Sequence, residues 1–315
     1  MSILKNIFGI RTTQNRLYKV ITIFGFKFQV ENFTTKLWDT ITRPFLNFRF
    51  HRFIMKQRVI VCLTSFPKRI DELHYCIYSL LKQSRRPDIV ALYLAAEEFP
   101  KGEASLPENL LSLRSHGLQI RWCENIGSYK KLLPALKEFP NDLLVTADDD
   151  LYYEKSWLAK LLYSYARHPE DINAHRAHRI RFGANGRPLP YAEWEYERQY
   201  IKDDPPTALN FATTGGGILY PPGSFYKDVE NAALALKLCP TGDDIWFWAM
   251  CVLNGKKFRI IQDGTKKVRF ISLKKQLSAP RLSAINCDRK KNDEQISAML
   301  KHYPELLGIL KKSAD

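Results

Sequence analysis

Two acidic clusters stand out among the residues that could do chemistry. The segment LLVTADDD (143–150) ends in three consecutive carboxylates, and the segment TGDDIWFW (241–248) carries Asp243 and Asp244. Like charges at this spacing repel one another unless a cation joins them. Carboxylate oxygens are hard ligands and select Mg²⁺ or Mn²⁺. The first cluster therefore indicates a site that awaits a positive partner.

Residue alternation predicts which acids of the first cluster act together. In an extended chain, side chains two positions apart share a face, so Asp148 and Asp150 are expected to project together while Asp149 points away. The alternative is an acidic cluster that is favoured by the dipole of a helix beginning near Ser156. Pairing of Asp148 and Asp150 with lysines or arginines of the same chain would contradict the cation-binding hypothesis.

Strands and helices alternate around the first cluster. The patterns predict buried strands over 58–66, 88–95, 118–124 and 142–150, with helices over 69–84, 106–117 and 129–139 between them. Short strands joined by helices imply right-handed crossovers and an α/β fold with a mostly parallel sheet. Ligands of such sheets bind beyond the carboxyl ends of the strands. The three acids are expected at such an end.

The second half is less regular. It predicts helices over 156–168, near 226–238 and from 243, strand character broken by a turn at 185–186, and an amphipathic tail over 292–312. The spacing of His168, His175 and His178 suits surface positions on a strand better than a metal cage. The six cysteines are scattered without metal-ligand spacing and are expected to be free thiols, mostly buried.

The chain has 315 residues and a net charge of +15, concentrated at the N-terminus. Residues 1–58 hold eleven Lys and Arg against Glu31 and Asp39, with many aromatic residues between them. This composition favours an anionic membrane surface as the partner of the segment. Nucleic acid would attract the same charges but is not the expected partner. The remaining alternative is a basic face that is exposed to solvent and binds nothing. A hairpin over 18–30 and helix on either side of Pro44 are predicted here.

The patterns divide the chain into a basic aromatic extension (1–57), a main domain (58–265) and a helical tail (266–315). No stretch of the sequence is apolar for long enough to predict a membrane span or a signal peptide. We therefore expect a cytoplasmic protein, either soluble or peripheral on the inner face of the plasma membrane.

Four segments in order carry a resemblance to a known family. They are LTSFPKRI (63–70), TADDD (146–150), GGGILYPP (215–222) and TGDDIWFW (241–248). Together they resemble a glycosyltransferase of the GT-A fold, in the family 2-like group that builds bacterial surface polysaccharides such as lipopolysaccharide and capsule. The resemblance spans about residues 58–265. The aspartate motif alone is weak evidence, and the order and spacing of the four segments make the match specific.

The resemblance implies sugar transfer from a nucleotide sugar, with a UDP-sugar as first choice, to a hydroxyl of a glycan or lipid-linked acceptor, metal-assisted and inverting. The residues that it implies for donor binding are Thr64, Ser65, Arg69, Lys130, Lys131, Asp148 and Asp149. Asp150, with Asp148, would hold the Mn²⁺ or Mg²⁺ that bridges the diphosphate. The missing positive charge would thus arrive with the donor. Strand-end, helix-cap and surface-lysine roles remain open alternatives.

The second cluster and the glycines complete the implied site. Asp244, or alternatively Asp243, would be the base that deprotonates the acceptor hydroxyl, unless the pair only caps a helix. The acceptor side would be shaped by Gly215, Gly216, Gly217 and Trp246. Three residues without Cβ atoms permit close approach of a ligand or form a tight bend. The chain lacks a late metal-binding histidine, since only His302 follows Asp244.

Two rival functions fit part of the sequence. A haloacid dehalogenase-like phosphatase also begins with such an aspartate motif, but it needs Thr or Val two residues after the second aspartate, where Tyr152 stands. A non-catalytic protein that binds membranes or nucleic acid through residues 1–57 would leave both acidic clusters unexplained.

Overall fold

The computed structural model describes residues 57–197, 200–201, 204–261, 268–272 and 291–314 in full, and the backbone of residues 8–12, 18–23 and 26–31. The chain divides into two compact units, residues 1–53 and 54–315. The helix predicted on either side of Pro44 lies outside the described residues, and so does Cys287.

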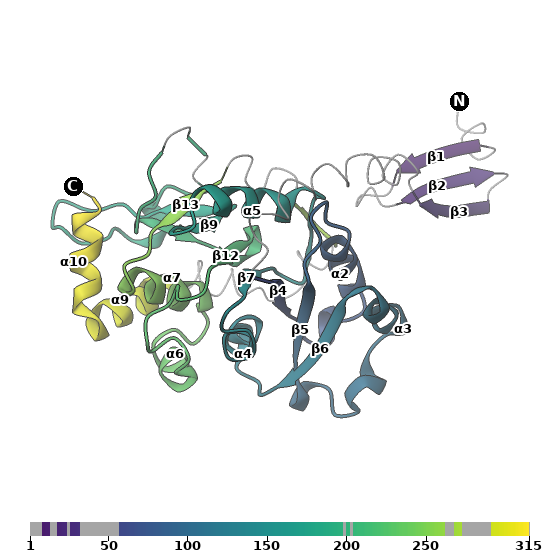
Figure 1. Cartoon of the computed structure of the whole chain (residues 1–315), viewed down its shortest axis with the longest axis horizontal. Coiled ribbons are helices and arrows are strands. Elements are labelled where there is room, and N and C mark those ends of the chain that lie inside the picture. The colour runs from purple at the N-terminus through teal and green to yellow at the C-terminus, as the bar shows by residue number, and fades with distance from the viewer. Residues whose placement is uncertain are drawn as a thin grey trace. The chain divides into compact units, whose positions relative to one another are not determined.

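The first unit contains a small antiparallel sheet. Its strands are β1 (Phe8–Thr12), β2 (Tyr18–Ile23) and β3 (Phe26–Glu31), in the order β1-β2-β3. The pairing of β2 with β3 runs from Tyr18↔Glu31 to Ile23↔Phe26, so two residues connect the strands. These strands cover the segment for which the sequence predicts a hairpin (Figure 1).

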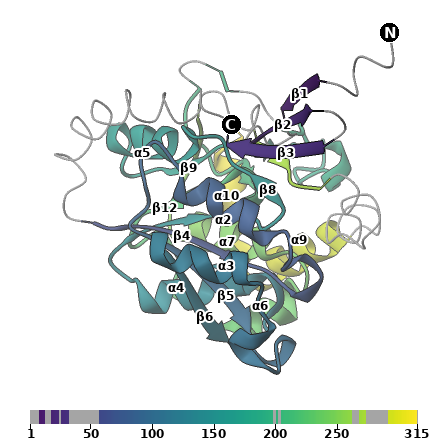
Figure 2. The ribbon, with the colours of Figure 1, turned by 90° about the vertical axis from the view of Figure 1, so that its right-hand side faces the viewer.

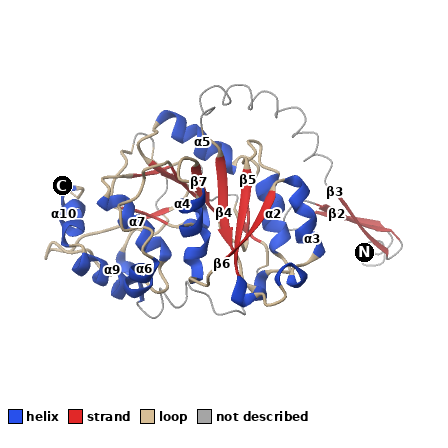
Figure 3. Ribbon diagram, turned by 60° about the horizontal axis from the view of Figure 1, so that its bottom comes forward, coloured by secondary structure: helices blue, strands red, loops and turns tan. Residues whose placement is uncertain are grey.

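A seven-stranded mixed sheet forms the centre of the second unit (Figure 3). Its order is β13 (Phe258–Ile260), β9 (Ile172–Ala174), β12 (Ile218–Tyr220), β7 (Leu143–Thr146), β4 (Val59–Thr64), β5 (Ile89–Ala95) and β6 (Leu118–Cys123). β12 runs antiparallel to both neighbours, and the other pairs are parallel. The predicted α/β fold with a mostly parallel sheet flanked by helices is confirmed.

Helices cover both faces of this sheet. α2 (Leu73–Leu81) and α3 (Glu108–Leu111) lie on one face, and α4 (Leu133–Glu138), α6 (Ala232–Leu238) and α7 (Asp243–Leu253) lie on the other (Figures 1 and 3). α5 (Trp157–Arg167) packs on β9 and β12. Gly117 ends the segment after α3 with a φ of 111°, a left-handed conformation that favours glycine.

Two smaller ribbons extend the unit beside the sheet. β10 (Ala177–Arg179) pairs with β11 (Asn210–Ala212), and β8 (Leu151–Tyr152) pairs with β14 (Arg269–Phe270). Both ribbons begin a few residues after strands of the main sheet. They therefore extend the walls of the region beyond the carboxyl ends of those strands.

The C-terminal tail packs on the second unit as two helices. α9 (Lys291–His302) and α10 (Pro304–Lys312) both contact α7 (Figures 1 and 2). Gln295 Oε1 accepts a hydrogen bond from the Thr241 backbone N at 2.9 Å, and the Tyr303 hydroxyl donates one to Asp228 at 2.9 Å. In the described part of the chain, no helix combines the length and apolar character required to cross a bilayer.

One close contact fixes the start of β12. Gly217 has a φ of 102°, and a Cβ atom there would lie 2.4 Å from Cζ2 of Trp157. The Trp157 indole donates a 2.7 Å hydrogen bond to the Gly216 carbonyl and is fully buried. The indole thus occupies the space that a side chain at residue 217 would need.

We predict that Gly217→Ala lowers the free energy of unfolding by about 3 kcal/mol or more, because left-handed strain adds to overpacking. Gly255→Ala is the matched control, since Gly255 also has a positive φ, 76°, but nothing lies within 4 Å of its Cβ position. It should cost only about 1–2 kcal/mol. Equal losses in chemical denaturation would contradict the steric explanation.

Candidate active site

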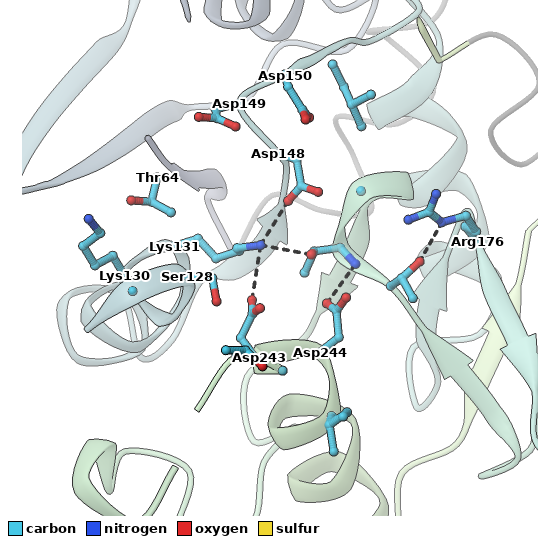
Figure 4. A pocket seen from close by; sticks show the side chains of 18 of the residues that line it. Thr64, Ser128, Lys130, Lys131, Asp148, Asp149, Asp150, Arg176, Asp243 and Asp244 are labelled. Atoms are coloured by element: carbon cyan, nitrogen blue, oxygen red, sulfur yellow. Dashed lines mark hydrogen bonds and ion pairs between the residues drawn. The ribbon is translucent and has the colours of Figure 1, made fainter. Parts of the chain in front are cut away.

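A cavity of about 640 Å³ lies beyond the carboxyl ends of β4, β5 and β7 (Figure 4). Most residues predicted for the site line it, although they come from segments far apart in the sequence. These are Thr64, Ser65, Arg69, Lys130, Lys131, Asp148, Asp149, Asp150, Gly215, Asp243 and Asp244. The parallel strands β4 and β7 end at one edge of the sheet and the antiparallel β12 begins there, which brings Thr64, Asp148 and Gly215 together.

The first acidic cluster is already paired within the chain. Asp148 Oδ1 lies 3.0 Å from Lys131 Nζ, while Arg69 Nη1 lies 2.6 Å from Asp149 Oδ1 and 2.9 Å from Asp150 Oδ2. Ser65 Oγ donates a further 2.7 Å hydrogen bond to Asp149 Oδ2. The expectation that these acids await a positive charge from outside the chain is therefore wrong.

The predicted grouping of Asp148 with Asp150 is also wrong. β7 ends at Thr146, and Asp149 and Asp150 lie in a turn. The alternation of an extended chain no longer applies there, so these two neighbours share Arg69 while Asp148 faces Lys131 (Figure 4).

The ammonium group of Lys131 connects the first cluster with the second. Its Nζ donates hydrogen bonds to Asp148 Oδ1 and Thr214 Oγ1, each at 3.0 Å, and lies 3.2 Å from Asp243 Oδ2 in an ion pair without hydrogen-bond geometry. Burial lowers the pKa of Lys131, but the charges of Asp148, Asp243 and Asp244 outweigh burial and raise it. Lys131 therefore stays protonated.

Carboxylates outnumber cations in the cavity wall, seven to four. The acids are Glu98, Asp148, Asp149, Asp150, Glu197, Asp243 and Asp244, and the basic residues are Arg69, Lys130, Lys131 and Arg176. A buried charge without a counter-ion is costly. This surplus explains why Lys131 and Arg69 are each shared between two carboxylates.

The carboxyl group of Asp244 has a pKa close to neutral pH. It lies in the first turn of α7, where its Oδ1 accepts a 3.0 Å hydrogen bond from the Thr214 backbone N. Burial and the adjacent charge of Asp243 raise its pKa from 3.8 to about 7, against the opposing effect of Lys131. Asp244 can therefore exchange a proton with a ligand at physiological pH.

Side chains of the same protein pack against the glycine backbone where the sequence predicted a ligand. A Cβ atom on Gly215 would lie 2.9 Å from Arg176 Nη2 and 3.0 Å from Asp148 Oδ2, so both side chains pack against bare backbone. Gly216 and Gly217 do not line the cavity and instead contact Trp157. Of the three glycines predicted for the acceptor side, the structure brings only Gly215 to the cavity.

The prediction that Trp246 shapes the acceptor side of the site is wrong. It is fully buried, its indole donates a 3.0 Å hydrogen bond to the Val229 carbonyl, and it does not line the cavity. Trp248 is buried in the same way and donates to the Ala208 carbonyl at 3.0 Å. α7 is apolar on nearly all sides, so it lies within the core and only its acidic start reaches the cavity.

Two histidines predicted at surface positions are buried. His175 is 2% exposed and stacks on Trp157, with ring centroids 5.9 Å apart. His178 is 5% exposed, lines the cavity and accepts a 2.9 Å hydrogen bond at Nδ1 from the Glu197 backbone N. Burial and the charge of Arg176 lower its pKa to about 4, so His178 is neutral at physiological pH.

Sequence reasoning missed several residues of the cavity wall. Arg176 Nε donates a 2.6 Å hydrogen bond to Thr213 Oγ1, and Glu98 forms a 2.6 Å ion pair with Lys130. Arg176 and His178 are two apart in an extended segment, so they share a face. That alternation in HRAHRI was the available signal for Arg176; nothing local marks Glu98.

We predict that Asp244→Asn stabilises the protein increasingly from pH 4 to pH 7. The folded carboxyl keeps its proton up to a pKa of about 7, whereas the unfolded one loses it near 3.8, so the wild type loses stability across this window. The substitution removes that loss and keeps the oxygen that accepts from Thr214. Denaturation at several pH values measures the difference, and a difference that does not change with pH would contradict the raised pKa.

No family model and no curated protein matches the chain. Solved structures with similarity include S. aureus TarS, with a TM-score of 0.43 and 17% identity over 66% of this chain, which spans only 35% of the length of that TarS chain. TarS 1–349, also crystallised with UDP-GlcNAc, has a TM-score of 0.46 and 15% identity, covering 81% of this chain and 83% of that one.

Another similar structure is the mannosyltransferase PcManGT from Pyrobaculum calidifontis in complex with GDP-Man and Mn²⁺. Its TM-score is 0.30 at 16% identity, with 45% of each chain covered. At these TM-scores and identities, the likenesses assign neither a family nor a function to the chain.

Proposed function

We propose that the protein is a GT-A type glycosyltransferase that moves a sugar from a nucleotide-sugar donor to a hydroxyl of a glycan or lipid-linked acceptor in cell-surface polysaccharide synthesis. The observation that carries the proposal is Asp244, whose raised pKa of about 7 suits a general base in a 640 Å³ cavity.

In this reaction, Asp244 takes the proton of the acceptor hydroxyl. The hydroxyl oxygen forms a bond to the anomeric carbon while the bond from that carbon to the nucleoside diphosphate breaks. The displacement inverts the anomeric centre. A base with a pKa close to the working pH is partly ionised and still accepts a proton readily.

We place the donor against the first-strand side of the cavity. Thr64 ends β4 and Ser65 follows it there, on the side for which the family resemblance implies contact with the nucleotide. Arg176 and Lys130 are the basic residues that we propose to face the diphosphate, because Lys131 and Arg69 are each shared between two carboxylates. A UDP-sugar is the first donor to test.

The residues do not fit a resident divalent cation. Nζ of Lys131 and Nη1 of Arg69 lie against the carboxylates that were expected to hold Mn²⁺ or Mg²⁺. Over the described ranges, no group of three or more His, Cys, Asp or Glu side chains is arranged to hold a metal. We therefore derive no step of the transfer through a protein-bound metal.

We predict that Asp244→Asn lowers kcat for sugar transfer by about 100-fold or more, because a general base contributes on that order. Donor affinity should stay within about threefold of wild type, since the base acts on the acceptor. In the wild type, kcat/KM should rise with pH up to about 7 and then level, as Asp244 loses its proton. Isothermal titration with UDP-, GDP- and CMP-sugars, followed by transfer and hydrolysis assays, provides the measurement.

Asp171→Asn is the matched control. Asp171 pairs with Arg259 at 2.7 Å and does not line the cavity, so its loss should leave transfer unchanged. Failure of every nucleotide sugar to bind would end the transferase proposal, and full activity of Asp244→Asn would exclude Asp244 as the base.

We also propose that residues 1–57 hold the protein at an anionic membrane surface close to a lipid-linked acceptor. The segment has a large excess of Lys and Arg. Each basic residue near an anionic leaflet contributes about 1 kcal/mol of binding free energy, and salt screens the attraction.

The chain should accordingly sediment with phosphatidylglycerol vesicles at low salt and remain in the supernatant with phosphatidylcholine vesicles. A chain lacking residues 1–53, the first compact unit, should remain in the supernatant with both. Equal recovery of the two chains from phosphatidylglycerol vesicles would contradict a membrane role for the segment.

A further inference from the structure

We propose that Lys131 is a built-in cation which occupies the position between the two acidic clusters, so that this position binds no divalent metal in the native protein. Lys131 is then a positioning residue rather than a donor-binding one. The inference deepens the proposed function. Only its consequence for sugar transfer rests on that proposed function.

The geometry of the ammonium group supports this role. Three oxygens surround Nζ, those of Asp148 and Thr214 at 3.0 Å and that of Asp243 at 3.2 Å. Two of its three N–H donors bind Asp148 and Thr214, and the ion pair with Asp243 holds a third oxygen beside the charge. Lys131 is only 6% exposed. It therefore has little capacity left to bind a substrate phosphate.

The three oxygens come from three segments that carry the site. Asp148 follows β7, Thr214 lies in the turn before β12, and Asp243 begins α7. Thr214 in turn donates its backbone N–H to Asp244. By joining these segments, Lys131 fixes the position of the catalytic carboxylate relative to the first acidic cluster.

The same three oxygens are hard ligands of the kind that Ca²⁺ and Mn²⁺ prefer. With Lys131 removed, two carboxylates and a hydroxyl would surround a small space that no longer holds the ammonium group. Uncompensated buried carboxylates attract any cation that fits. Removal of the lysine is therefore expected to create a metal site that the native protein lacks.

Lys130 supplies the matched control. It is adjacent in sequence, carries the same charge and is 3% exposed. Its ammonium, however, pairs with a single carboxylate, Glu98, at 2.6 Å. Loss of Lys130 leaves one carboxylate and so does not create a site with several oxygen ligands.

The experiment measures thermal unfolding of the full chain with EDTA, CaCl₂ or MnCl₂. Lys131→Ala should gain about 3 °C or more in Tm at about 10 mM of either ion, and EDTA should reverse the gain. The wild type and Lys130→Ala should shift by less than about 1 °C. A destabilised variant with no ion-dependent shift would overturn the inference, because purely structural loss predicts that result.

A second measurement does not depend on the folding of Lys131→Ala. Equilibrium dialysis with ⁵⁴Mn²⁺, in the absence of nucleotide, measures how much Mn²⁺ the wild type and Asp243→Asn bind. The two proteins should bind the same amount, because Asp243 holds no ion in the native protein. Stoichiometric binding to the wild type that disappears in Asp243→Asn would overturn the inference. Neither measurement uses donor or activity, so a failure here is distinguishable from a failure of the proposed sugar transfer.

Discussion

The organisation of the cavity depends on one ammonium group placed among carboxylates. Lys131 is buried and touches acids that are 17 and 112 positions away in the sequence, at the ends of β7 and at the start of α7. Without this charge, burial of Asp148 and Asp243 beside Asp244 would be electrostatically costly. The same charge also limits how far the pKa of Asp244 rises. Charge balance therefore both permits the burial of these acids and limits the pKa of Asp244.

The core explains how an acidic helix start can be held so close to other acids. α7 is buried along most of its length, and Trp246 and Trp248 anchor it through indole hydrogen bonds to carbonyls of neighbouring segments. This packing leaves α7 no freedom to move its first turn away from the cavity. Apolar burial of the helix body thus offsets the repulsion among the acids at its end.

The sequence predicted the helices and strands well, but it predicted poorly which side chains contact each other. Strand and helix patterns are local, and the rule that parallel strands end at one edge placed Asp148 beside a ligand site. Asp244, at the start of a helix, was assigned to the same site only by the family resemblance. The pairing of Arg69 with two acids, or of Trp157 with Gly217, depends on segments that meet only in the folded chain. The orientation of Trp246 and the burial of His178 were misjudged for the same reason, because residue spacing does not show which face a neighbouring element covers.

Helix α9 of the C-terminal tail is part of the cavity wall rather than an appendage. Gln295 on α9 holds the backbone at Thr241, two residues before Asp243, and Asn292 lines the cavity itself. Asp293, also on α9, accepts a 2.7 Å hydrogen bond from the backbone N of Tyr191, another lining residue. Truncation of this end of the polypeptide, or fusion of a bulky partner close to α9, would therefore disturb the wall of the cavity itself.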